Sequence, residues 1–131
     1  DIFSENGEPY FRELETEIVK DISVHLPESQ LKKAISNILS NAVNYTETGK
    51  SIKVSLDKSR LIIQNDCVPL SSNELQHIFE PFYRPDRVYT SANGGNGLGL
   101  YIVKTILDKL ELQYHFKPMH FGNGMEFVIF F

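Results

Sequence analysis

The sequence lacks the cysteine pairs of a disulfide-bonded protein and the long apolar runs of a membrane-spanning one. Cys67 is the only cysteine, which excludes an internal disulfide and suits a reducing cytosol. No apolar run approaches the roughly 18 residues that a membrane-spanning helix needs. The sequence begins at Asp1 with neither an initiator Met nor a recognisable signal peptide, so we expect it to be cut from a longer chain.

Positive charge is also scarce. The chain carries 13 Lys and Arg against 17 Asp and Glu, for a net charge of −4, which disfavours nucleic acid or direct contact with an anionic membrane. A phosphate-bearing ligand remains compatible, because a bound divalent cation supplies local positive charge. The 131 residues, 41% of them hydrophobic, suit one globular domain. We expect a ragged end over residues 1–8 and a single domain over 9–131.

Apolar residues recur with helical spacing in two long segments, 28–45 and 98–110. Weaker helical patterns cover 10–20 and 70–79, the second opening at Ser71 or Ser72 with Glu74 as its capping partner. Alternating apolar residues predict short strands, at 21–26, 51–56, 60–64, 112–116 and 125–131. This order predicts an α+β two-layer sandwich, in which a mixed β-sheet carries about three helices on one face.

Three asparagines, Asn37, Asn41 and Asn44, share one face of the 28–45 helix, with Tyr45 beside Asn41. Asparagine is a weak helix former, so three of them cost about 1.5 to 2 kcal/mol relative to alanine. An amide oxygen is a neutral ligand that suits Mg²⁺ already carrying phosphate oxygens and water. The alternative is an ordinary solvated polar face.

A glycine-rich string, Gly94-Gly95-Asn96-Gly97-Leu98-Gly99-Leu100, leads directly into the second long helix. Glycines let backbone N–H groups approach a polyphosphate, and the helix N-terminus adds unpaired donors and the positive end of its dipole. The alternative is a flexible hinge. The string is not a Walker A loop, because no Gly-Lys-Ser/Thr follows, and it is a poor match to a Rossmann fingerprint.

A third motif has the sequence Ile78-Phe79-Glu80-Pro81-Phe82-Tyr83-Arg84-Pro85. Its last residues open a predicted loop over 81–95, which is longer than most connections between helices and strands. We expect Phe79 and Phe82 to anchor this mobile loop to the core while Arg84 projects outward. A guanidinium in such a loop can reach a γ-phosphate and stabilise charge during transfer. The alternative is a buried aromatic pair beside an exposed arginine.

In this order, the three motifs resemble those of the histidine-kinase branch of the Bergerat-type (GHKL) ATPases. The family's N box, F box, G2 box and last glycine box resemble residues 31–46, 79–84, 95–100 and 122–127. The resemblance spans about 31–131, and the sequence is similar in style to Firmicute kinases that respond to vancomycin or lantibiotic peptides. It implies the Bergerat ATP-binding fold, with a mobile ATP lid over 82–96.

The resemblance also implies ATP and Mg²⁺ as cofactors. Asn41 would ligate the metal, and Asn41 and Arg84 would be the catalytic residues. The implied nucleotide contacts are Asn37, Asn41, Asn44, Tyr45, Asn65, Leu70, Phe79, Phe82, Arg84, Arg87, Gly95, Gly97, Leu98, Gly99 and Leu100.

The sequence departs from the family pattern at several positions. Asn65 replaces the aspartate that reads adenine, and Cys67 and Pro69 replace two glycines of the same box. Asn44 stands in place of a lysine and Met125 in place of a threonine. An Asn oxygen still accepts from the adenine amino group but lacks the strength of a carboxylate. We therefore expect weak nucleotide affinity, tightened by Asn65→Asp, and we expect Asp66 to point away from the base.

The resemblance implies transfer of the γ-phosphoryl group to a histidine on a separate dimerisation domain, and from there to a response regulator. The full-length kinase would be a membrane-anchored homodimer, and this part a cytoplasmic domain that is monomeric when isolated. One alternative is a pseudokinase-like module that binds nucleotide without transfer. A gyrase-, chaperone- or mismatch-repair-type ATPase would need a carboxylate in the first long helix, where only Glu28 stands. A purely structural domain would not bind ATP.

The four histidines, His25, His77, His115 and His120, do not lie in the sequence context of a phosphoacceptor. A zinc site is disfavoured, because there is no cysteine pair and no short ligand spacing.

Overall fold

The computed structural model describes residues 27–57, 59–85 and 97–131. The helix predicted over 10–20, the strand predicted over 21–26, and Arg87 and Gly95 lie outside these ranges. Among the described residues, no helix is both long enough and apolar enough to cross a membrane.

The described elements follow the predicted order and types. They are α2 (Glu28–Tyr45), β1 (Ile52–Leu56), β2 (Arg60–Asp66), α3 (Ser72–His77), α4 (Gly99–Lys109), β3 (Gln113–Pro118) and β4 (Gly124–Phe130). The predicted 28–45 helix is confirmed to the residue. The other elements shift by a few residues at their ends, where hydrogen bonding rather than side-chain pattern decides the boundary.

The strands form one sheet in the order β1-β2-β4-β3, and each described neighbour pair is antiparallel. The sequence predicts a mixed sheet; the described strands contain no parallel pair, and the fifth predicted strand lies outside the described residues. β4, although last in sequence, lies between β2 and β3, so Asn65 of β2 stands opposite Met125 of β4.

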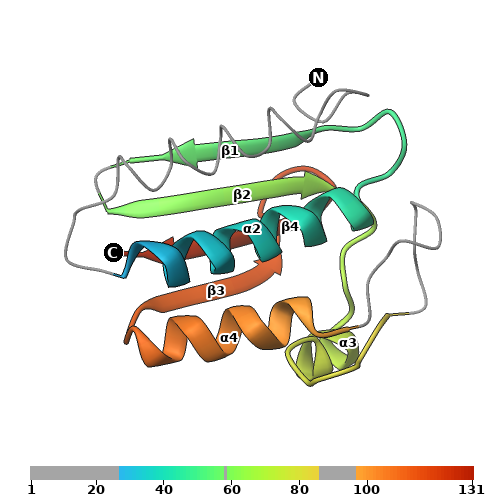
Figure 1. Ribbon diagram of the computed structural model, residues 1–131. Helices are drawn as coiled ribbons and strands as arrows, with labels where there is room; N and C mark the ends of the chain where they lie inside the picture. Colours follow the sequence, from blue (N-terminus) through green and yellow to red (C-terminus); the bar gives the residue numbers. More distant parts are fainter. Residues whose placement is uncertain (1–26, 58, 86–96) are drawn as a thin grey trace.

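Helices α2 and α4 cover one face of this sheet and give the two predicted layers (Figure 1). The strands alternate, so that Leu61 and Ile63 of β2 and Phe127 and Ile129 of β4 point toward the helices and are at most 2% exposed. The buried stripe of α2 is the predicted one, Leu31, Ala34, Ile35, Ile38, Leu39 and Ala42. Because this stripe faces the sheet, the asparagines of α2 are left on the helix's other side.

The short helix α3 begins with the predicted capping box. Ser71 Oγ accepts from the backbone N–H of Glu74 at 3.1 Å, and Glu74 Oε1 accepts from the backbone N–H of Ser71 at 2.9 Å. Two otherwise unpaired donors are satisfied reciprocally, which stabilises a helix too short to persist alone. In this way α3 is placed beside the start of α4 (Figure 1).

Candidate functional site

Two adjoining hollows lie where the C-terminal end of α2 meets the start of α4 and the end of α3. They share Asn41, Tyr45, Ile78 and Pro85. We call the first the polar half; its other lining residues are Asn37, Ser40, Asn44, Tyr83, Gly97, Leu98, Gly99, Leu100 and Ile102. We call the second the apolar half; its other lining residues are Asn65, Cys67, Val68, Leu70, Phe116 and Met125.

The polar half brings together the two segments that the sequence singled out. Asn37, Asn41 and Asn44 are half-buried on one side of α2, and residues 97–100 line the same hollow from the side of α4. The space between them is about 290 Å³, near the lower limit of roughly 300 Å³ for small-molecule pockets. The predicted juxtaposition of these two surfaces around one cavity is confirmed.

The start of α4 can receive an anion. Leu98 is its N-cap, and its side chain makes no capping hydrogen bond. The first N–H groups of a helix have no partner within the helix, and they lie at the positive end of its dipole. A phosphate group placed in the polar half would therefore meet the donor end of α4.

Gly97 is required by the backbone geometry. Its φ is +82°, and a Cβ there would lie 2.6 Å from the carbonyl carbon of Phe82. The two residues are also joined by a hydrogen bond of 3.0 Å from the N–H of Phe82 to the carbonyl of Gly97. This close approach of the two backbones brings the two ends of segment 82–97 together at the rim of the polar half.

Phe79 and Phe82 behave differently from each other, and the expectation that both anchor the loop is wrong. Phe79 packs edge-on against Tyr114, Phe116 and Phe127, with ring centroids 5.9 to 6.4 Å apart. Phe82 is 70% exposed, because a positive φ of 69° turns the chain there. Neither ring lines either half of the cavity.

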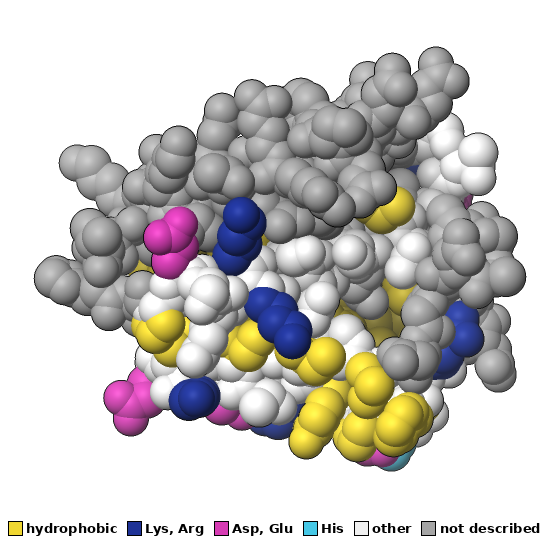
Figure 2. Space-filling model, viewed as in Figure 1, with side chains coloured by type: hydrophobic (Ala, Val, Ile, Leu, Met, Phe, Trp, Pro, Cys, Tyr) yellow, Lys and Arg dark blue, Asp and Glu magenta, His cyan; other side chains and the backbone are white. Residues whose placement is uncertain are grey.

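Hydrophobic side chains gather over α3 and the start of α4 on the helical side of the molecule (Figure 2).

Arg84 is exposed, as predicted, but it does not line either half of the cavity. Its contact with a γ-phosphate stays a prediction.

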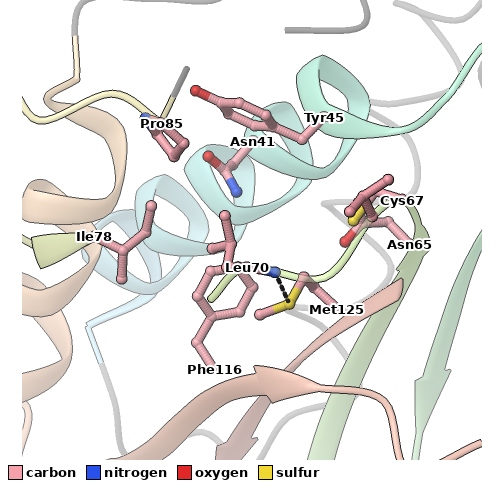
Figure 3. Close-up of a pocket in the computed structure, with 10 residues that line it drawn as sticks. Asn41, Tyr45, Asn65, Cys67, Leu70, Ile78, Pro85, Phe116 and Met125 are labelled. Atoms are coloured by element: carbon pink, nitrogen blue, oxygen red, sulfur yellow. Dashed lines mark hydrogen bonds between the residues drawn. The ribbon is translucent and has the colours of Figure 1, made fainter. Parts of the chain in front are cut away.

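The apolar half is a narrow slot. Figure 3 shows Asn41, Tyr45 and Pro85 on one side and Leu70, Phe116 and Met125 on the other. Its space of about 20 Å³ suffices for roughly one water molecule. The N–H of Leu70 donates to Met125 Sδ at 3.4 Å. The flexible Met125 side chain of β4 thus contacts the segment that follows β2.

Asn65 lies at the end of β2, is 6% exposed and lines this slot. Its side-chain oxygen is directed into the slot (Figure 3). Asp66 faces the other way, as predicted, and its Oδ2 accepts from the backbone N–H and the hydroxyl of Ser51 at 3.1 and 2.9 Å. Gly124 permits the close approach of β4, because a Cβ there would lie 2.1 Å from the carbonyl oxygen of Asn65.

Several lining residues were not among the predicted contacts, above all Ile78, Pro85, Phe116 and Met125. Phe116 could have been found from the alternation of its strand, which places it on the same face as Tyr114. Met125 becomes a neighbour of Asn65 only through the β2–β4 register, for which the sequence carries no local signal.

No Asp, Glu, Lys, Arg or His is among the described residues that line either half. Nor do the described residues contain a cluster of three or more His, Cys, Asp or Glu that could hold a metal ion.

The groups with shifted pKa values lie outside both halves of the cavity. Hydrogen bonds lower the pKa of Asp57 and Asp108, the second through Lys104. Burial would raise the pKa of Glu126, but hydrogen bonds from Gln64 and His115 outweigh it and lower that pKa.

Such a sandwich, with its cavity between an amide-bearing helix and a glycine-flanked helix start, has the architecture of an ATP-binding domain. Residues 27–131 match the family described as histidine kinase-, DNA gyrase B-, and HSP90-like ATPases, and the chain belongs to that family. The resemblance drawn from the sequence is confirmed, and family membership implies that the domain uses ATP.

Among curated proteins, the chain is similar to the sensor histidine protein kinase HK06 of Streptococcus pneumoniae. The two are 39% identical over 99 residues, covering 76% of this chain and 22% of the relative. The chain is also similar to the sensor protein VanSB of Enterococcus faecalis, with 38% identity over 88 residues, covering 64% of this chain and 20% of the relative. Thus the chain spans about a fifth of the length of these relatives.

Among solved structures, the fold is similar to that of the mycobacterial sensor histidine kinase MprB. The TM-score is 0.65 at 23% identity, covering 93% of this chain and 90% of that one. The catalytic domain of histidine kinase ThkA gives a TM-score of 0.66 at 21% identity, covering 92% and 86%. These similarities confirm the α+β fold of histidine kinase catalytic domains.

Proposed function

We propose that this chain is the ATP-binding catalytic domain of a two-component sensor histidine kinase. It transfers the γ-phosphoryl group of ATP to a histidine on a separate dimerisation and phosphoacceptor domain, from which a response regulator receives it. One observation carries the proposal: the amides of α2 and the donor end of α4 face each other across one cavity. The relatives named as sensor kinases support it.

In the proposed complex, the phosphates occupy the polar half, against residues 97–100. The carboxamide of Asn41 points into the cavity (Figure 3), and the described lining offers no carboxylate that could hold Mg²⁺ by itself. A neutral amide oxygen suits Mg²⁺ that arrives already bound to phosphate and water. The donor set therefore fits a shared metal, which would neutralise charge on the phosphates.

The base occupies the apolar half, between Tyr45 and Pro85 on one side and Phe116 and Met125 on the other. Because the slot has room for only one water, its lining must separate as the base enters. Met125 and Leu70 have flexible side chains that can repack. Burial of the base there stabilises the complex, and Asn65 supplies the polar contact.

Catalysis then rests on positioning and on stabilisation of charge. The histidines that the structure describes do not line the cavity, and His77 and His115 lie against Glu80 and Glu126 at 2.6 and 3.4 Å. In the proposed reaction, the acceptor is a histidine on another domain, whose imidazole attacks the γ-phosphorus as the bond to the bridging oxygen of ADP breaks. Arg84, which is exposed next to the cavity-lining Tyr83 and Pro85, would contact the γ-phosphate.

The test is phosphorylation in trans, with the chain, Mg²⁺, γ-labelled ATP and the separately purified dimerisation domain of the parent protein. We expect an acid-labile label on that domain's histidine, absent with Asn41→Ala and strongly reduced with Arg84→Ala. Nucleotide binding without any transfer would instead support a pseudokinase-like module, which the departures from the family pattern at Asn65, Cys67 and Pro69 favour as the second candidate. Failure to bind nucleotide would contradict both.

We further propose that the parent protein is a homodimeric, membrane-anchored kinase and that this domain lies on its cytoplasmic side. Net acidity disfavours contact of the domain itself with nucleic acid or anionic lipid.

A further inference from the structure

The apolar half holds a neutral hydrogen-bonding group where a purine edge would lie. Asn65 is 6% exposed, and its carboxamide oxygen points into the slot between hydrophobic side chains (Figure 3). The hydrogen bond drawn there joins the N–H of Leu70 to Met125 Sδ and does not involve the carboxamide of Asn65. The nearby carboxylate of Asp66 is committed to Ser51.

A carboxamide and a carboxylate read a purine edge differently. The edge of adenine presents a donor, the 6-amino group, beside an acceptor, N1. That of hypoxanthine presents the reverse, an acceptor at O6 beside a donor at N1. An ionised carboxylate only accepts, whereas a carboxamide has an oxygen acceptor and an N–H₂ donor side by side. Turning the carboxamide by half a turn exchanges the two, so it matches either edge.

Asn41 and Tyr45 also line the apolar half, but both are shared with the polar half, and Asn41 is the proposed metal ligand. Besides Asn65, the side chains that line the apolar half alone are Cys67, Val68, Leu70, Phe116 and Met125, which stack on a base of either kind without distinguishing the polar atoms of its edge. A buried site that leaves a carboxylate facing O6 would reject the 6-oxo base strongly, because both partners would be acceptors. Asn65 removes that penalty.

We infer that Asn65 gives this domain a relaxed purine selectivity, so that it takes 6-amino and 6-oxo purine nucleotides with similar affinity. The inference rests on the proposed function, since it assigns the base of the bound nucleotide to the apolar half. It makes Asn65 the residue that sets base selectivity in this domain.

The test is calorimetric titration of the chain with ADP, inosine diphosphate and purine riboside diphosphate, each with Mg²⁺. Diphosphates avoid hydrolysis, and the third ligand lacks any group at position 6. We expect ADP and inosine diphosphate to bind within about fivefold of each other, and the third to bind about fivefold to tenfold more weakly than either, as expected for one lost hydrogen bond. This comparison needs no variant.

Asn65→Asp should introduce a selectivity for ADP. We expect tighter ADP binding and a ratio of the two dissociation constants that rises at least about tenfold in favour of ADP, because a charged acceptor strengthens one pairing and opposes the other. The matched control is Asn73→Asp, the same change on the exposed surface of α3 outside both halves; the ratio stays as in the wild type.

A wild-type preference for ADP over inosine diphosphate beyond about 100-fold would overturn the inference and leave the proposed function intact. Equal binding of all three ligands would also overturn it, because position 6 would then not be read. Absence of binding by every nucleotide would contradict the proposed function itself.

Discussion

In the proposed complex, the two halves of the cavity hold one nucleotide by different means. The polar half has about 290 Å³ of space and is lined by carboxamides and by the backbone at the start of α4, whereas the apolar half is a slot of about 20 Å³ with a single buried carboxamide, Asn65. In the proposed complex, the phosphates would therefore enter a space that is already formed, while the base would have to separate the walls of its slot. Neither half has an ionised side chain among its described residues.

This difference teaches where binding energy comes from. In the proposed complex, the positive charge that balances the phosphates in the polar half would come from a metal and from the dipole of α4 rather than from lysine or arginine in the described lining. In the apolar half, the binding energy would come from burial of a planar base against hydrophobic side chains. Asn41 and Tyr45 line both halves, so they connect the two contributions.

The largest effect is expected at Asn41. Asn41→Ala removes the proposed metal ligand, and since second-shell changes around metal sites already cost roughly 10- to 100-fold, we expect Mg²⁺-dependent ATP binding to fall beyond detection. The melting temperature of the free protein stays within a degree or two, because the side chain is only half-buried. Calorimetric titration of a non-hydrolysable ATP analogue, with Mg²⁺ and with EDTA, measures this.

Asn73→Ala, on exposed α3, is the control for Asn41→Ala and binds as the wild type does. Persistence of Mg²⁺-dependent binding in Asn41→Ala would show that Asn41 is not the ligand. If EDTA left wild-type affinity unchanged, the polar half would not depend on a metal, and the two halves would not differ in the way described.

A matched pair of glycines tests whether the polar half is preformed. Gly97→Ala forces a side chain to a φ of +82° and against the backbone of Phe82, so we expect a loss of about 2 to 3 kcal/mol in unfolding free energy. At Gly99 a Cβ meets nothing within 4 Å, and we expect Gly99→Ala to raise stability by about 0.5 kcal/mol.

Urea denaturation, with nucleotide absent, measures both glycine variants. Equal losses for the pair would mean that the approach of Phe82 to Gly97 does not hold the rim of the polar half in place.

The two halves also differ in how far the sequence predicts them. In the polar half, many of the lining groups lie in two continuous segments whose periodicity and glycines are visible locally, so the family resemblance of these motifs implies that Asn41 and Gly97 belong to one site. The walls of the apolar half come from α2, β2, β3, β4, the segment 67–70 and residues that follow α3. Met125 meets Asn65 through strand register, and Pro85 and Ile78 arrive through the packing of α3, which no short window of sequence encodes.

The error at Phe82 has the same origin. Its spacing from Phe79 suggests two anchors, but a positive φ of 69° at Phe82 turns its ring outward. A left-handed conformation at a phenylalanine is rare and has no sequence signature of its own. Spacing therefore predicts the buried ring of Phe79 and not the exposed one.

A smaller effect is expected where α3 supports the apolar half. Ser71→Ala removes the hydroxyl that accepts from the N–H of Glu74, which should cost about 1 kcal/mol of stability. Because Leu70 precedes Ser71 and lines the slot, nucleotide affinity should also fall, by less than about tenfold. Ser72→Ala, on the next exposed residue, is the control, and its change in thermal stability should stay below about 0.5 kcal/mol.

The smallest effect concerns the sheet face that lies away from both halves. There Glu126 accepts from Gln64 at 2.9 Å and lies 3.4 Å from His115, and these partners lower its pKa despite the opposing effect of burial. A carboxyl whose pKa is lower when folded stabilises the protein above its unfolded pKa, and that stability is lost as the pH falls through its folded pKa. Stability should therefore decline as the pH drops below about 4.5.

Glu126→Gln should remove about 0.5 kcal/mol of stability at pH 7. It should also make the decline with pH shallower without abolishing it, because Asp57 and Asp108 have lowered pKa values too. Nucleotide affinity at pH 7 should not change, since Glu126 lines neither half. Thermal unfolding from pH 7 to pH 3 measures the change in stability, and calorimetric titration measures the nucleotide affinity. A loss of affinity in Glu126→Gln would show that the sheet face that carries Glu126 is coupled to the cavity.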